Sequence, residues 1–146
     1  MNIKTAWKPL FTQTNRATGT FMGVFDNVGT KSNGEEFTYT AAYFSVGGVK
    51  DNEKVAQDVE IRLTEVYRPE NQLGKLAKAL GFEYKEKTQV DELGLVVPVS
   101  NNLEELDKLF DTLEGQVFQF KMVEDKMKGI WSIATPTIKP FTVRPN

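Results

Sequence analysis

Aromatic side chains lie on several strand-like segments of this 146-residue chain, with basic side chains interleaved nearby. An exposed aromatic ring can stack on a nucleobase, and a nearby lysine or arginine can neutralise a phosphate. This is the chemistry that a groove for single-stranded nucleic acid requires. The candidate rings are Phe25, Tyr39, Tyr43 and Trp131, and the candidate cations are Lys31, Arg62, Lys121, Lys126 and Lys128.

Aromatic residues on strands also build cores, and this alternative applies to the phenylalanines first. For Phe44, Phe118 and Phe120 we favour burial, because phenylalanine has no polar group to keep wet. A tyrosine keeps a hydroxyl that is easily left in water. Tyr39 and Tyr43 also have threonine and alanine as neighbours, which leaves room above the sheet for a ligand.

Catalysis has little support in the composition. The chain has no histidine and no cysteine, so the commonest general base, the commonest metal ligand and the thiol nucleophile are all absent. Asp58, Glu60, Asp91 and Glu92 are carboxylates that could hold a hard cation, but the first two alternate with apolar residues as on a solvated strand face. We therefore predict no enzyme activity, no metal site and no cofactor. Gly47 and Gly48 do not fit a phosphate loop, and we interpret them as turn residues.

The composition is that of one folded domain spanning residues 1–146. Hydrophobic residues make up 40% and charged residues 26%, and a formal net charge of -2 argues against a histone-like protein that coats duplex by bulk charge. No apolar run approaches the roughly 20 residues of a membrane helix. The start of the chain lacks a signal-peptide core. We expect a soluble, cytoplasmic protein that does not contact a membrane.

Three strand-like runs open the domain after a polar N-terminal arm over residues 1–18. They span Thr20–Val28, Glu36–Val46 and Val55–Tyr67, with turn-rich residues 29–34 and 47–52 between them. Short turns of this kind join neighbouring antiparallel strands, so the pattern predicts a meander.

Alternation within these runs separates two faces. Val59, Ile61 and Leu63 alternate with polar residues, which predicts one buried and one wet face. Tyr39 and Tyr43 share a face with the other odd-numbered residues of the second run. A register shift of one residue would exchange the core and the ligand-facing side chains.

Residues 69–114 form an insert with helical periodicity. The pattern predicts one short helix around Leu73–Leu80 that ends at Gly81. A second helix is expected to start at Asn102, whose side chain would cap it. Residues 82–100 between the helices are interpreted as irregular, with Pro98 confining any strand to an edge.

Strand alternation returns after Gly115. Residues 117–123 and 130–134 are predicted to pair as a hairpin around a polar turn at 124–129, which carries Lys126 and Lys128. The order of elements predicts a mainly β fold, an OB-like barrel of five antiparallel strands with a two-helix insert between strands 3 and 4.

Three short motifs carry a resemblance to a known family. They are Gly-x-Phe-x-x-x-Phe at Gly19–Phe25, Leu-Gly-Lys-Leu-Ala-Lys-Ala-Leu-Gly at Leu73–Gly81, and Leu-Glu-Gly-Gln-Val-Phe at Leu113–Phe118. With the element order over residues 19–140, the chain resembles phage- and plasmid-type OB-fold single-stranded DNA-binding proteins. The resemblance implies cooperative coating of single-stranded DNA in replication or recombination, often as an oligomer. The chain departs from many such proteins in lacking an acidic tail.

Two hypotheses for the function follow. The first is a non-catalytic, sequence-tolerant protein that binds single-stranded DNA, with RNA left open as a ligand and a homo-oligomer as its assembly. The second is a protein–protein adaptor or structural barrel that uses the same rings and the apolar strip 93–99 as a contact surface. Binding that weakens with salt would favour the first hypothesis.

Overall fold

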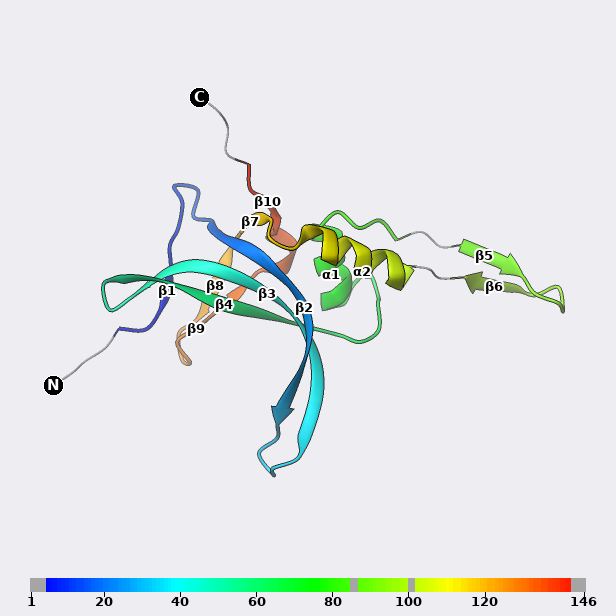
Figure 1. Ribbon diagram of the computed structural model, residues 1–146, viewed down its shortest axis with the longest axis horizontal. Helices are drawn as coiled ribbons and strands as arrows, with labels where there is room; N and C mark the ends of the chain where they lie inside the picture. Colours follow the sequence, from blue (N-terminus) through cyan, green and yellow to red (C-terminus); the bar gives the residue numbers. More distant parts are fainter. Residues whose placement is uncertain (1–4, 85–86, 100–101, 143–146) are drawn as a thin grey trace.

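The chain is mainly β with two α-helices (Figure 1). The computed structural model describes residues 5–84, 87–99 and 102–142. The strands are β1 Lys8–Pro9, β2 Ala17–Thr30, β3 Glu36–Lys50, β4 Glu53–Leu63, β5 Lys87–Val90, β6 Val96–Val99, β7 Val117–Phe120, β8 Met122–Asp125, β9 Ile130–Ile133 and β10 Lys139–Pro140. The helices are α1 Gln72–Ala79 and α2 Asn102–Leu113, and a 3-10 turn, η1, spans Thr135–Thr137.

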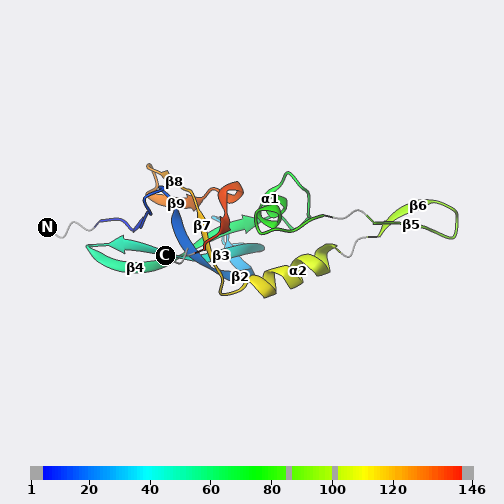
Figure 2. The ribbon, with the colours of Figure 1, turned by 90° about the horizontal axis from the view of Figure 1, so that it is seen from above.

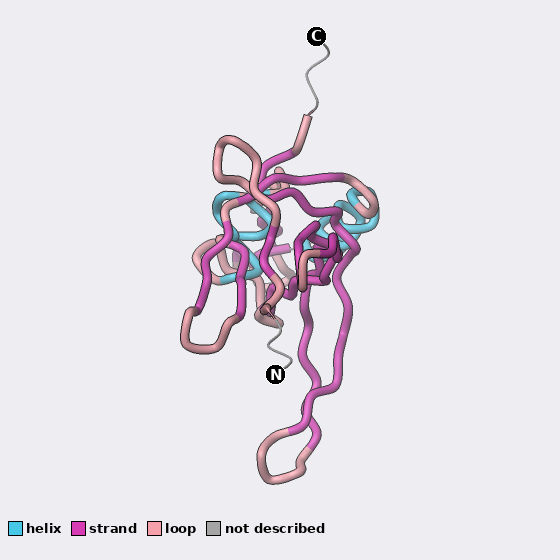
Figure 3. Tube along the Cα trace, turned by 90° about the vertical axis from the view of Figure 1, so that its left-hand side faces the viewer, coloured by secondary structure: helices cyan, strands magenta, loops and turns pink. Residues whose placement is uncertain are grey.

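The three long strands β2, β3 and β4 form the predicted antiparallel meander. β7 extends this sheet on the far side of β2, and β10 pairs with β7. β1 pairs with the end of β3. Figure 3 shows the β2–β3 hairpin extending well beyond the helices, so part of this sheet has no second layer over it.

The structure shows open antiparallel sheets where the sequence predicts a closed five-stranded barrel. β8 and β9 pair only with each other, as the predicted hairpin, and within the described residues no ladder joins them to the large sheet. The predicted strand 117–123 divides at Lys121. Its amide donates to Thr137 Oγ1 at 2.9 Å and its carbonyl accepts from the Ala134 amide at 2.9 Å. The chain therefore leaves the large sheet at Lys121.

Both predicted helices are present, with one difference at a cap. Asn71 caps α1 by accepting from the Gly74 amide at 3.0 Å, and Gly81 follows with φ +94°. Gly81 thus takes the left-handed conformation expected after a helix C-terminus. Asn102 is the first helical residue of α2 and not its cap; the preceding residue lies outside the described part of the chain.

The insert between the helices is not irregular, as the sequence suggested, but contains the β5–β6 hairpin. Asp91 organises its turn, because one carboxylate oxygen accepts from the amides of Leu93 and Leu95 at 2.9 and 2.8 Å. In Figures 1 and 2 this hairpin extends away from the rest of the chain. Pro98 lies in β6, which has a free outer edge in its two-stranded sheet, so it removes no ladder hydrogen bond from a central strand.

The core lies on one face of the meander. The prediction that Val59, Ile61 and Leu63 are buried is confirmed, as is the burial of the predicted core phenylalanines. The largest fully buried side chains are Phe21, Phe44, Phe118 and Phe120. Residues of α1, α2 and β9 complete the same cluster, so the insert covers the core face of the sheet.

The N-terminal arm is fixed by Trp7. Its ring is buried against Gly48, and its indole N–H donates to the Val55 carbonyl at 2.9 Å. Gly47 and Gly48 are therefore not turn residues as interpreted from the sequence. They lie inside β3, and the turn follows at Asp51 and Asn52, which both have positive φ, as in a two-residue hairpin turn.

We expect Gly48→Ala to destabilise the protein by about 1–3 kcal/mol, the usual cost of overpacking. A Cβ at this position would collide with the Trp7 ring. Gly47→Ala is the matched control, since nothing lies within 4 Å of a Cβ placed there. Urea unfolding of both variants measures the difference, and equal stability of the two would contradict the close fit of Trp7.

Candidate functional site

A bulge in β2 turns the ring of Phe25 outward. Phe21 lies opposite Phe44, with both side chains in the core, but the next pairing joins Gly23 to Tyr43. Met22 is therefore an extra residue, and the alternation of β2 reverses after it. Phe25 is brought to the face opposite the core, even though it lies four positions after buried Phe21 and would share its face in a regular strand.

Gly23 is needed at this bulge because of its backbone conformation. Its φ of +116° is one that residues other than glycine rarely adopt. The bulge and its glycine therefore fix the position of Phe25.

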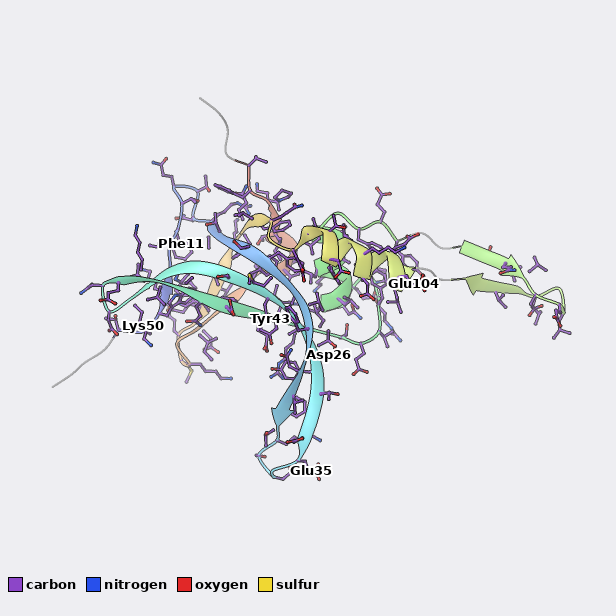
Figure 4. The ribbon with its side chains drawn as sticks, in the orientation of Figure 1. Phe11, Asp26, Glu35, Tyr43, Lys50 and Glu104 are labelled. Carbon is purple, nitrogen blue, oxygen red and sulfur yellow. The ribbon has the colours of Figure 1, made fainter. Side chains whose placement is uncertain are left out.

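The outer face of the meander carries a row of rings that we call the aromatic strip: Phe25, Phe37, Tyr39 and Tyr43. Ring centroids of Phe25 and Tyr43 are 6.1 Å apart, and those of Phe37 and Tyr39 are 5.7 Å apart. Phe25 is 48% exposed and the others are half-buried. In Figure 4, Tyr43 lies between the body and the hairpin tip that carries Glu35, so the strip follows the bend of the β2–β3 hairpin.

Arg62 of β4 extends the strip with a cation. Its guanidinium carbon lies 4.3 Å from the Tyr39 ring centroid and 5.9 Å from that of Phe37. This is cation–π geometry. The planar guanidinium covers the ring of Tyr39, while the Arg62 side chain itself remains 61% exposed.

One carboxylate joins the polar groups of the strip. Glu60 Oε2 accepts from the hydroxyl of Tyr39 at 3.2 Å and from that of Tyr43 at 3.0 Å. Its other oxygen accepts from Arg62 Nε at 3.0 Å. The two tyrosines and the arginine are thus oriented by a single acidic side chain.

These contacts also change the acidity of the strip. Partial burial, and then the hydrogen bond to Glu60, raise the pKa of Tyr43 to about 12. The hydrogen bond to Glu60 raises the pKa of Arg62 above its ordinary value. At neutral pH the Tyr43 hydroxyl is therefore a donor and the Arg62 guanidinium carries its charge.

The structure brings together four of the nine predicted site residues: Phe25, Tyr39, Tyr43 and Arg62. Trp131 does not join them, because it packs against the core cluster and against Phe11, with ring centroids 5.8 Å apart.

The remaining predicted cations are also apart from the strip. Lys31 lies at the β2–β3 tip, 3.7 Å from Glu35. Lys126 and Lys128 are exposed in the β8–β9 turn, and Lys121 is exposed where β7 ends. Arg62 is therefore the predicted cation that contacts the rings.

Two residues of the site, Phe37 and Glu60, are not among those that the sequence predicts. Phe37 shares the face of Tyr39 and Tyr43 in the period-2 alternation of β3, which was sufficient to find it. Its ring lies over Gly29, which leaves the space for it. The alternation of β4 predicts a solvated face for Glu60, and no local pattern indicates that two tyrosines of the neighbouring strand donate to it.

No family model, curated protein or solved structure matches the chain. Over residues 5–84, 87–99 and 102–142, no three acidic side chains gather as metal ligands. In the same ranges, no helix has the length and apolar character needed to cross a membrane.

We expect Tyr43→Phe to reveal the raised pKa through the pH dependence of stability. An unfolded tyrosine ionises near pH 10, whereas folded Tyr43 stays protonated to about pH 12. The stability contributed by this hydroxyl is therefore full below pH 10 and is lost as the pH rises toward 12. Urea unfolding of both proteins across this window should show their free energies of unfolding converge; a constant difference would contradict the Tyr43–Glu60 contact.

Proposed function

We propose that the protein binds single-stranded DNA through the aromatic strip, without catalysis and without strong sequence preference. The observation that carries this proposal is the row of rings on the uncovered face of the meander, with Arg62 among them. Stacking of bases on rings tolerates any sequence, because every base has a π-face. The proposal also includes an OB-like barrel, which is favoured by the position of β9 beside β4. It further includes assembly as a homo-oligomer.

The geometry of the strip favours a flexible ligand. Phe25 offers the most exposed ring. The remaining rings lie on β3, which bends together with β2 in Figure 1. A single strand can follow such a bend and turn its bases toward the sheet. A duplex keeps its bases stacked inside, so the rings would gain nothing from it.

Charge sets a limit on the proposed binding. The formal net charge is -2, and within the strip Arg62 is paired with Glu60. Few phosphates would be neutralised, so we expect stacking to supply most of the affinity, and the salt dependence to be shallower than for a strongly basic protein.

Loss of one ring tests the proposal. We expect Phe25→Ala to weaken binding of a labelled oligo-dT about 5- to 150-fold, since one stacked base contributes about 1–3 kcal/mol. Fluorescence anisotropy at low and moderate salt measures the affinity. Tyr84→Ala is the matched control, because Tyr84 is a comparably exposed ring (46%) that stacks on Tyr67 outside the strip.

The same anisotropy experiment is repeated with a duplex of matched length, and its affinity is compared with that of the single strand. We expect wild-type protein to prefer the single strand, with affinity falling as salt rises. Absence of binding to either oligonucleotide at micromolar protein would overturn the proposal. Equal losses of oligo-dT affinity in Phe25→Ala and Tyr84→Ala would show that the aromatic strip is not the binding surface.

A second candidate function, a protein–protein adaptor, has one specific observation in its favour. The β5–β6 hairpin extends from the body and exposes apolar side chains, with Val90 at 64%, Leu93 at 84% and Val96 at 69%. An isolated two-stranded hairpin is only marginally stable in water, so a protein surface packed on it would stabilise it. This function takes first place if neither oligonucleotide binds.

A further inference from the structure

We infer that Glu60 occupies a phosphate site of the aromatic strip in the free protein, and that a backbone phosphate of the bound strand displaces it. This inference rests on the proposed function and deepens it by naming how the site is regulated. In this arrangement the strip is masked by its own carboxylate, and binding requires an exchange of one anion for another.

Three donors converge on the Glu60 carboxylate: the hydroxyls of Tyr39 and Tyr43 and the Nε–H of Arg62, at 3.2, 3.0 and 3.0 Å. Tyrosine hydroxyls and guanidinium groups are among the donors that proteins use for phosphate oxygens. Arginine in particular suits phosphate as well as carboxylate, because its donors form a planar fork. The site that holds Glu60 therefore has the donors of a phosphate site.

The position of Glu60 allows it to leave. Its side chain is 31% exposed and that of Arg62 is 61% exposed, so both can rotate into water without opening the core. Salt bridges at this level of exposure are weak. A polyanion that brings its own phosphate can compete for the same three donors.

Release of Glu60 would also uncover a stacking surface. The guanidinium of Arg62 now covers the Tyr39 ring at 4.3 Å, and one of its N–H groups is held there by Glu60. Once Arg62 follows a phosphate, the face of Tyr39 becomes free for a base. Displacement of one carboxylate thus exposes a cation and a ring together.

Asp58 provides a matched control on the same strand. It lies two residues before Glu60, on the same face of β4, and is exposed. Within the described part of the chain, no side-chain hydrogen bond or ion pair involves Asp58. Asp58→Asn and Glu60→Gln therefore remove the same charge from neighbouring positions, but only the second removes the anion held by the strip.

The test measures oligo-dT affinity and its salt dependence for wild type, Glu60→Gln and Asp58→Asn, with a thermal melt to confirm folding of each. We expect Glu60→Gln to bind about fivefold tighter, the size of effect expected for an exposed ion pair. Its slope of log K against log salt should steepen by about 0.7, because in wild type the freed Glu60 carboxylate takes up cations that offset those released from the phosphate, and the variant has no such carboxylate. Asp58→Asn should stay within about twofold of wild type, with an unchanged slope.

The outcomes separate this inference from the proposed function. If wild type binds but Glu60→Gln binds no tighter than Asp58→Asn, the inference is overturned while the proposed function stands. Weaker binding by Glu60→Gln also overturns it, since Glu60 would then position the rings for the ligand. Binding by Glu60→Gln alone supports the inference strongly. If none of the three proteins binds, the proposed function fails and the inference fails with it.

Discussion

The bulge at Met22 is the constraint on which the two faces of the meander depend. Before it, the odd-numbered side chains of β2 enter the core and Phe21 packs against Phe44, with ring centroids 5.2 Å apart. After it, Phe25 lies on the opposite face beside Tyr43. Because strand alternation is strictly two-fold, one inserted residue is enough to divide a run of similar sequence into a buried half and an exposed half. β2 thus contributes Phe21 to the core and Phe25 to the aromatic strip, whose other rings lie on β3.

Two aromatic rings pack closely on glycines of the meander: Trp7 on Gly48 and Phe37 on Gly29. Trp7 seats on Gly48 and joins the N-terminal arm to β3 and β4. On the outer face, Phe37 covers Gly29. On the core face, the helical insert and β9 cover the large sheet, whereas the β2–β3 hairpin extends beyond them. A face left without a second layer can hold rings that neither the core nor another element occupies.

The aromatic strip combines four rings with a single ion pair, formed by Arg62 and Glu60. Tyr39 and Tyr43 donate to Glu60, and Arg62 is held by the same carboxylate while it covers one ring. A groove with few cations suits a ligand whose bases are accessible, because stacking does not depend on net charge. The carboxylate at its centre gives the free protein a satisfied set of donors; in the proposed binding, a phosphate would exchange with this anion instead of filling an empty site.

Local patterns determined much of this protein. Period-2 alternation predicted the meander, the buried face of β4 and the shared face of Tyr39 and Tyr43, and period-3.6 spacing predicted both helices, because these periods follow from backbone geometry alone. The tertiary structure decided what depends on residues distant in sequence. Trp7 packs on Gly48, which lies with Gly47 inside β3. Lys121 leaves the large sheet through contacts with Ala134 and Thr137, and Trp131 packs against the core cluster. Glu60 joins the tyrosines for the same reason: strand pairing, and not the chain around it, brings their donors to its carboxylate.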